Sequence, residues 1–244
     1  DIGWRYTFLG IAVFCLVTMV PLAFALRRRP PGAGGAASLS VPAGSPRLPD
    51  GLSPNGLLAL LMIAGVFCCI AMSMPQVHIV AYCADLGYGV ARGAGMLSLM
   101  VGFGIVSRVA TGWLADRVGG AMTLLIGSTL QCVALVFYLV ADTLASLYLA
   151  SALFGLFQGG IVPSYAIIVR EYFPAREAAS RVGLTVSSTI VGMALGGWMG
   201  GVLFDLTGSY RAAFINGIGW NVLNAAVAWW LLSRQNRTRA PHGA

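Results

Sequence analysis

The sequence predicts an integral membrane protein built entirely from α-helices. Hydrophobic residues make up 58% of its 244 residues and charged residues only 9%, and its mean hydropathy is +0.82. A soluble domain carries about 25% charged residues. Seven apolar segments are each long enough to cross a bilayer as a helix, which needs about 20 residues. These segments are 5–26, 56–83, 94–115, 122–141, 144–169, 182–204 and 212–232.

The positive charges predict the orientation of these helices. All 15 basic residues are arginines. One set of alternate helix ends carries Arg27, Arg28, Arg29, Arg47, Arg117, Arg170, Arg176, Arg181, Arg234, Arg237 and Arg239, and the other carries Arg5, Arg92 and Arg211. By the positive-inside rule the richer side is cytoplasmic. The helices are therefore predicted to span the cytoplasmic (inner or plasma) membrane, with the N-terminus of this chain outside and its C-terminus in the cytoplasm. Arginines spread over helix ends do not form a nucleic-acid-binding face.

The chain divides into four predicted parts. Residues 1–29 hold the first helix, and 30–54 are rich in Pro, Gly, Ala and Ser, which is typical of a flexible cytoplasmic linker. Residues 55–233 form a bundle of six helices, and 234–244 a cytoplasmic tail. The chain starts at Asp1, without a Met and without the basic n-region of a signal peptide, so we expect it to be a fragment.

The second segment carries a polar pair beyond a proline. Pro75 frees a carbonyl one turn back, which membrane helices tolerate beside a cavity or a neighbouring helix. His78 and Tyr82 are four residues apart and share a face. They are predicted either to line a cavity, where His78 would titrate near neutral pH, or to form an interfacial pair near the outer headgroups.

Arg108 is the central candidate residue, because it lies within the third apolar segment. An arginine inside the bilayer costs about 2.5–3.5 kcal/mol on insertion scales, so it usually faces protein or a watery cavity. The planar guanidinium can donate two parallel hydrogen bonds to a carboxylate. Gly104, one turn earlier, leaves space beside the guanidinium. The alternative is a structural arginine that bonds carbonyls or reaches the inner interface.

Other polar residues carry weaker signals. Gly112, Asp116, Arg117 and Gly119 form a polar exit from the third helix that we interpret as part of a gate. Gln158 and Tyr165 are seven apart and are second-rank candidates for lining the cavity. The five cysteines lie in apolar runs without a metal-type spacing, so no metal or other cofactor is predicted.

A short internal sequence repeat indicates a protein of two repeated halves. The first helix opens with Gly3-Trp4-Arg5-Tyr6-Thr7-Phe8, and the last is preceded by Gly208-Ser209-Tyr210-Arg211-Ala212-Ala213-Phe214. The two lie six helices apart, as a protein of two six-helix halves requires.

The chain resembles the C-terminal half of the major facilitator superfamily. Residues 112–119, GWLADRVG, resemble its loop motif G-x-x-x-D-R-x-G, and Glu171-Tyr172-Phe173-Pro174 with Arg176, Arg181 and Gly183 resembles its link between the fourth and fifth helices of a half. The similarity is greatest to the monocarboxylate-transporter and oxalate/formate-antiporter branch. There an arginine of the eighth helix binds the substrate carboxylate, and Arg108 matches its place.

The resemblance implies an alternating-access transporter of a small organic anion. Seven helices would be present. The first would be the last helix of the N-terminal half, the other six would form the second half-bundle of a twelve-helix fold, and the rest of the N-terminal half would be missing. Three positions depart from the family pattern. Gly120-Ala121 replace the basic pair that usually ends the loop motif, and Gly104 replaces the aspartate that animal monocarboxylate transporters have one turn before the binding arginine. The lysine that resembles a second oxalate anchor in the eleventh helix of the antiporter is absent. A monocarboxylate is therefore favoured over a dicarboxylate, and a co-transported proton would have to use His78.

A seven-helix receptor and a membrane-embedded enzyme are the alternatives to a transporter. A seven-helix receptor fits the helix count, but a retinal photoreceptor needs a lysine in the membrane and the sequence has none. A membrane-embedded enzyme would need a catalytic motif, and neither H-E-x-x-H nor G-x-S-x-G occurs. The sequence is thus predicted not to be an enzyme.

Overall fold

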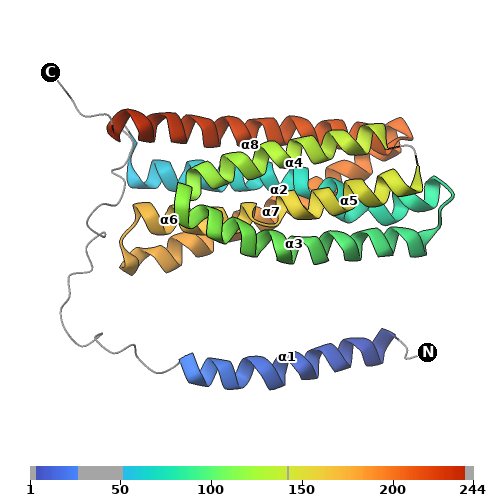
Figure 1. Cartoon of the computed structure of the whole chain (residues 1–244), viewed down its shortest axis with the longest axis horizontal. Coiled ribbons are helices and arrows are strands. Elements are labelled where there is room, and N and C mark those ends of the chain that lie inside the picture. Colours follow the sequence, from blue (N-terminus) through green and yellow to red (C-terminus); the bar gives the residue numbers. More distant parts are fainter. Residues whose placement is uncertain (1–3, 27–51, 142, 240–244) are drawn as a thin grey trace. The chain divides into compact units, whose positions relative to one another are not determined.

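The computed structural model describes residues 4–26, 52–141 and 143–239 as two units. The first unit, within residues 1–39, holds α1 (Trp4–Leu26), and the second, within 40–244, holds all the other helices (Figure 1). Most of the predicted linker, with Arg27, Arg28, Arg29 and Arg47, lies outside the described residues.

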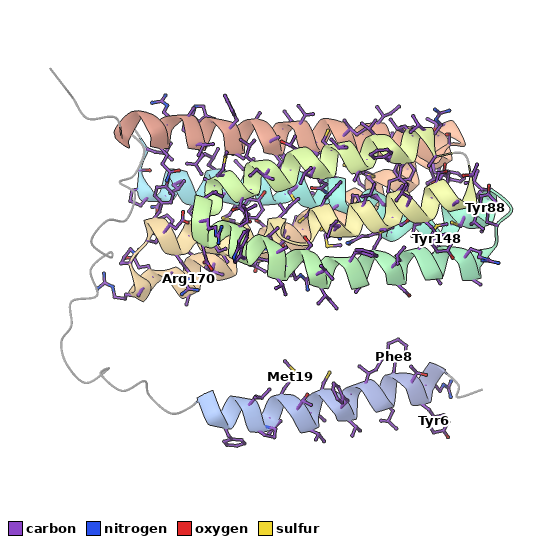
Figure 2. All side chains as sticks on the ribbon, viewed as in Figure 1. Tyr6, Phe8, Met19, Tyr88, Tyr148 and Arg170 are labelled. Carbon is purple, nitrogen blue, oxygen red and sulfur yellow. The ribbon has the colours of Figure 1, made fainter. Side chains whose placement is uncertain are left out.

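α1 is apolar around its whole circumference. Its most hydrophobic window has no buried residue, and large side chains such as Tyr6, Phe8 and Met19 point outward in several directions (Figure 2). A helix of this length that is apolar on every side is suited to lipid or to neighbouring membrane helices.

The second unit is a bundle of long helices joined by short turns (Figure 1). Its helices are α2 (Pro54–Asp85), α3 (Val90–Val118), α4 (Gly120–Val140), α5 (Leu144–Gln158), α6 (Ile161–Tyr172), α7 (Ala175–Thr207) and α8 (Tyr210–Arg239). α5 and α6 follow one another along a single apolar span, Leu144–Tyr172. The bundle therefore contains the six predicted helices, with the fourth of them broken into two.

Six spans in the described part of the chain are long and apolar enough to cross a membrane. The predicted seventh helix is present as α8 but is not among those six. Asn216, Asn221 and Asn224 lower its hydropathy. Asn221 and Asn224 are fully buried and donate hydrogen bonds of 2.7 Å to the backbone oxygen and the hydroxyl of Ser128 on α4. Their polarity is thus directed into the bundle rather than toward lipid.

Glycines bring the helices into close contact. On α7, Gly192, Gly196 and Gly200 are buried against α2, where an added Cβ would collide with backbone or side-chain atoms. On α5, Gly155 packs in the same way against the backbone of Met100 on α3. Small residues at such spacing allow helix backbones to approach one another closely.

The two ends of the bundle differ in charge. Arg117, Arg170 and Arg234 lie toward the end where α3, α6 and α8 finish. Arg92 and Arg211 lie in the first turns of α3 and α8, which begin at the opposite end of the bundle (Figure 1). Arg211 donates a hydrogen bond of 2.9 Å to the carbonyl of Leu139 near the end of α4. The arrangement agrees with alternate helix ends carrying unequal charge, and which end is cytoplasmic stays a prediction.

Candidate functional site

Arg108 lines a cavity of about 240 Å³ between four helical spans. α2, α3 and α7 form three of its walls, and the broken α5–α6 span forms the fourth. Its lining residues are Cys69, Met72, Gln76, Met100, Val101, Gly104, Arg108, Gln158, Gly159, Val162, Thr189 and Met193. Arg108 is the charged member of this lining, and the remainder combines apolar side chains with a few neutral polar groups.

The guanidinium of Arg108 is not committed to an acidic partner within the described residues. The ion pairs found there join Glu177 to Arg176 and to Arg181, at the start of α7. The Arg108 side chain is exposed in this unit, and no hydrogen bond of its guanidinium is present in that part of the chain. A guanidinium group that faces a cavity without a negatively charged partner is suited to bind an anion.

Gln158 lies beside this cavity because the fifth apolar segment is interrupted there. It is the last residue of α5, and Gly159 and Gly160 separate it from α6. Pro163 has no N–H, so the Gly159 carbonyl loses its helical donor. An added Cβ at Gly159 or Gly160 would collide with α3, so glycine at these two positions lets the broken span lie directly against Gly104 and Thr111.

Gln76 and Thr189 complete the polar lining. Gln76 directly follows Pro75 on α2 and is partly exposed. The Thr189 hydroxyl donates a hydrogen bond of 2.7 Å to the carbonyl of Val186, one turn back on α7. Gln76 was not among the predicted binding residues. Helix geometry predicts only that Gln76 and His78, two residues apart, face nearly opposite sides of α2.

His78 and Tyr82 lie together, but in a different place. The His78 ring is 9% exposed, and its Nε2 atom is 3.1 Å from the carbonyl oxygen of Gly197 on α7. Both rings lie 5.6 Å from the ring of Tyr210 at the start of α8. Neither residue lines the Arg108 cavity. The pair thus belongs to an aromatic cluster where α2, α7 and α8 meet.

Tyr165 lies in the interior of the bundle. Its side chain is fully buried, and its hydroxyl donates a hydrogen bond of 2.7 Å to Oδ1 of Asn224 on α8. The break between α5 and α6 separates it from Gln158, so the seven-residue spacing does not place the two on one continuous face. Of the predicted binding residues, the structure brings Arg108 and Gln158 to one cavity.

The predicted gate residues surround the turn between α3 and α4. Gly119 adopts φ 83°, which favours glycine, and its N–H donates to the Ala115 carbonyl at 2.9 Å. The Arg117 guanidinium lies over the ring of Trp113, 3.7 Å from its centroid. Gly112 is half-buried on the last turns of α3, and Asp116 is exposed.

Glu171 connects this turn to the end of α6. Its Oε1 atom accepts a hydrogen bond of 2.8 Å from the N–H of Gly120, the first residue of α4. A carboxylate at a helix N-terminus is also favoured by the helix dipole. The contact joins two segments that the sequence shows only as separate motifs.

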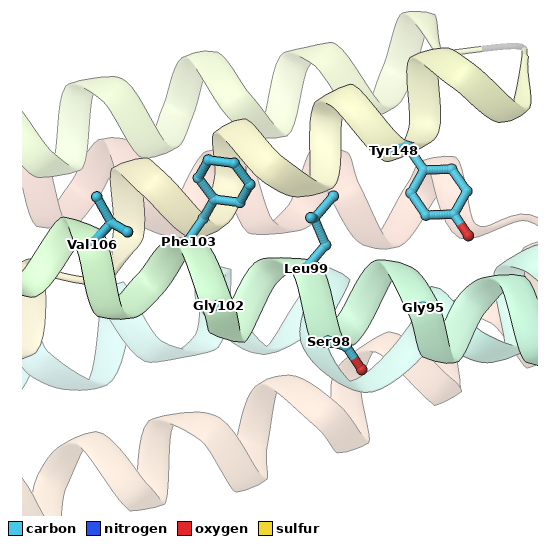
Figure 3. A pocket seen from close by; sticks show the side chains of 7 residues that line it. All are labelled: Gly95, Ser98, Leu99, Gly102, Phe103, Val106 and Tyr148. Atoms are coloured by element: carbon cyan, nitrogen blue, oxygen red, sulfur yellow. The ribbon is translucent and has the colours of Figure 1, made fainter.

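A second hollow lies on the opposite face of α3. Figure 3 shows Gly95, Gly102 and Tyr148 along it, with Leu99, Phe103 and Val106. Its volume is about 450 Å³ and its lining is almost wholly apolar. The lining residues include no ionisable acid or base except the phenol of Tyr148, so this hollow lacks the charge that an anion site needs.

Comparisons with known proteins agree on one family. The sequence profile described as Major Facilitator Superfamily matches residues 1–144 and 107–244. Monocarboxylate transporter 13 of Rattus norvegicus is 33% identical over 58% of this chain and 34% of its own length. Probable anion transporter 5 of Arabidopsis thaliana is 28% identical over 62% of the chain and 34% of its own length. The chain thus spans about a third of the length of these relatives.

A bacterial relative and a solved structure extend the comparison. The D-galactonate transporter of Escherichia coli is 32% identical over 46% of the chain and 24% of its own length. A crystal structure of the peptide transporter POT, an E310Q mutant in complex with sulfate, aligns with a TM-score of 0.65 at 18% identity. That alignment covers 75% of this chain and 39% of the other, and it supports a shared fold.

Proposed function

The chain belongs to the Major Facilitator Superfamily, and on this premise we propose that it is the C-terminal half of a secondary active transporter for a small organic anion. Its apolar spans make it an integral membrane protein, and its relatives are transporters rather than enzymes. The proposed substrate is a monocarboxylate, moved by alternating access.

The observation that carries this proposal is the unpaired guanidinium of Arg108 in a cavity. The cavity holds one positive charge and no carboxylate. A monocarboxylate would match that charge and take two parallel hydrogen bonds from the guanidinium. A dicarboxylate would bring a second negative charge for which this half offers no partner in the cavity.

The names of the relatives support an anionic substrate. Those described above are named for monocarboxylates, for anions and for D-galactonate, which is itself a carboxylate. These names concern those proteins. What they share with the cavity described here is a negative charge that Arg108 could bind.

Alternating access would need a second half-bundle. Transporters built from repeated halves bind substrate near the midplane between the halves, and one half rocks against the other. Arg108 is exposed in the isolated unit, as expected of a residue that would face such a partner. We propose that this partner is an N-terminal half and that α1 belongs to it. The turn with Gly112, Asp116, Arg117 and Gly119 would act as a cytoplasmic gate, with the C-terminus on the same side.

Proton coupling is the less supported part of the proposal. His78 is the imidazole within the described spans, and its ring lies between α2, α7 and α8. If a proton accompanies the anion, His78 is the group that we propose carries it. Tyr82 lies beside the same aromatic cluster and would accompany it.

Replacement of Arg108 tests the main proposal. The complete gene product that contains this chain is reconstituted in vesicles, and uptake of a labelled small monocarboxylate is measured for the wild type, Arg108→Ala and Arg108→Lys. We expect Arg108→Ala to abolish uptake and Arg108→Lys to retain part of it, since lysine keeps the charge but not the bidentate fork.

The matched control is Arg92→Ala, which removes an exposed arginine at the far end of the same helix. Equal reconstitution of all variants is checked by quantifying the protein in the vesicles. Unchanged uptake by Arg108→Ala at equal protein level would remove the basis of the proposal.

A further inference from the structure

Two glutamine side chains in the Arg108 cavity have no partner in the described structure. Gln158 is only 6% exposed, and neither its amide nor that of Gln76 makes a hydrogen bond there. Buried side-chain amides are nearly always hydrogen-bonded, to protein or to ordered water. Gln158 is such a buried amide, and the partly exposed Gln76 lies beside the same small space, so the contents of the cavity can supply the partner of both.

The neighbouring residues show what kind of partner this is. Apart from Arg108, the lining carries no charge, and the Thr189 hydroxyl already donates within its own helix. If Arg108 binds the carboxylate, the amides of Gln76 and Gln158 are left to contact the rest of the molecule. An amide offers two donors and one acceptor, so it pairs with a neutral hydroxyl or carbonyl group.

The helix break explains why Gln158 can be presented in this way. In a continuous helix the turn after Gln158 would carry side chains, but Gly159 and Gly160 leave that turn bare and pressed against α3. Gly159 lines the same cavity, and Pro163 leaves its carbonyl without a helical donor. The broken span thus supplies an amide, and it places beside the cavity a carbonyl to which Pro163 cannot donate.

We propose that Gln76 and Gln158 are specificity-determining residues, which select carboxylates that carry a hydroxyl or oxo group over unsubstituted alkyl acids. This inference rests on the proposed function, because it takes Arg108 as the partner of the carboxylate. The apolar remainder of the cavity, with Met72, Met100 and Met193, packs against the carbon chain. With a volume of about 240 Å³, the cavity favours short acids.

The expected preference for hydroxy acids arises because an unsubstituted acid has no group besides its carboxylate that can hydrogen-bond to the two amides. Such an acid would displace water from the amides without replacing the lost hydrogen bonds, and an unmet buried polar group weakens binding. We expect the hydroxy acid to bind about tenfold more tightly than its unsubstituted analogue. Removal of either amide is expected to reduce that preference by about threefold or more.

The test compares lactate with propionate, two acids of nearly equal size that differ by one hydroxyl. The complete gene product that contains this chain is reconstituted in vesicles at neutral pH, where both acids are ionised. Each is measured as a competitor of a labelled monocarboxylate. The variants are Gln76→Met and Gln158→Met, which conserve volume and remove the amide. Asn55→Leu removes an exposed amide at the start of α2 as a control.

Three outcomes are distinguishable. A wild-type preference for lactate that falls in both methionine variants, with propionate binding unchanged and Asn55→Leu like the wild type, supports the inference. Equal inhibition by the two acids in the wild type, or an equal loss for both acids in the methionine variants, overturns it. In that case Arg108→Ala would still lose both acids and the proposed function would stand. If neither acid competes in the wild type, this inference fails, and if the wild type takes up no labelled monocarboxylate at equal protein level, the proposed function fails with it.

Discussion

The carboxylate of Glu171 accepts a hydrogen bond of 2.8 Å from the backbone N–H of Gly120 and so ties the end of α6 to the start of α4. The bond combines a charged acceptor with an N–H at a helix N-terminus, where negative charge is favoured.

Removal of this bond should destabilise the bundle. We expect Glu171→Ala to lower the free energy of unfolding by about 1–3 kcal/mol, and Glu171→Gln to cost less because its amide oxygen still accepts. Thermal unfolding in detergent measures the difference. Asp205→Asn, which neutralises an exposed carboxylate at the other end of the bundle, is the control and should leave the melting temperature unchanged. Equal melting temperatures for Glu171→Ala and the wild type would contradict the prediction.

The α2–α7 contact should not tolerate a methyl group at Gly196. An added Cβ there would collide with the hydroxyl of Ser73 and the backbone of Ile70. Overpacking of this kind typically costs about 1–3 kcal/mol. Gly201→Ala is the matched control on the same helix, since its Cβ would have no neighbour within 4 Å. Melting curves of the two alanine variants give the comparison. Similar curves would mean that the helices are not in close contact at Gly196.

Tyr165→Phe separates a structural role from a binding role. Loss of the hydroxyl leaves Oδ1 of Asn224 buried without its donor, which should cost about 1–3 kcal/mol of stability. Because Tyr165 does not line the Arg108 cavity, we expect the folded variant to bind substrate with unchanged affinity. Tyr148→Phe, near the start of α5, serves as the control for stability. A large loss of affinity without a loss of stability would instead support the predicted role of Tyr165 in binding.

His78→Gln tests proton coupling without removing the contact to α7. The glutamine amide can still donate to the Gly197 carbonyl, but it does not titrate. If His78 carries the proton, uptake driven by a pH gradient should fall to the level seen without a gradient. Exchange of labelled for unlabelled substrate, which needs no net proton movement, should continue. A variant that still responds fully to the gradient would exclude His78 as the proton carrier.

The helices could be predicted from the sequence because hydropathy alone marks a membrane span. The same signal does not show where a span is interrupted, and residues 144–169 were therefore predicted as one continuous helix. The pair Gly159-Gly160 followed by Pro163 was the available sign of the break. α8 shows the reverse case, in which asparagines lower the hydropathy of a helix whose polar groups face inward.

The candidate site could be predicted only in part. An arginine inside an apolar segment stands out by its cost, and so Arg108 was found. Its neighbours depend on which helices adjoin, and Gln76 on α2 and Gln158 on α5 lie far apart in the sequence. Spacing within one helix gave His78 with Tyr82 correctly as neighbours, but it could not show that they lie away from the Arg108 cavity.

The break at Gly159-Gly160 leaves the two pieces of one membrane crossing attached to different parts of the bundle. α5 is seated on α3 through Gly155, whereas α6 is fastened to α8 by Tyr165 and to α4 by Glu171. Any shift of one piece relative to the other is absorbed at two residues without side chains, and one of them borders the Arg108 cavity. A shift between α5 and α6 would therefore change the backbone that borders the Arg108 cavity.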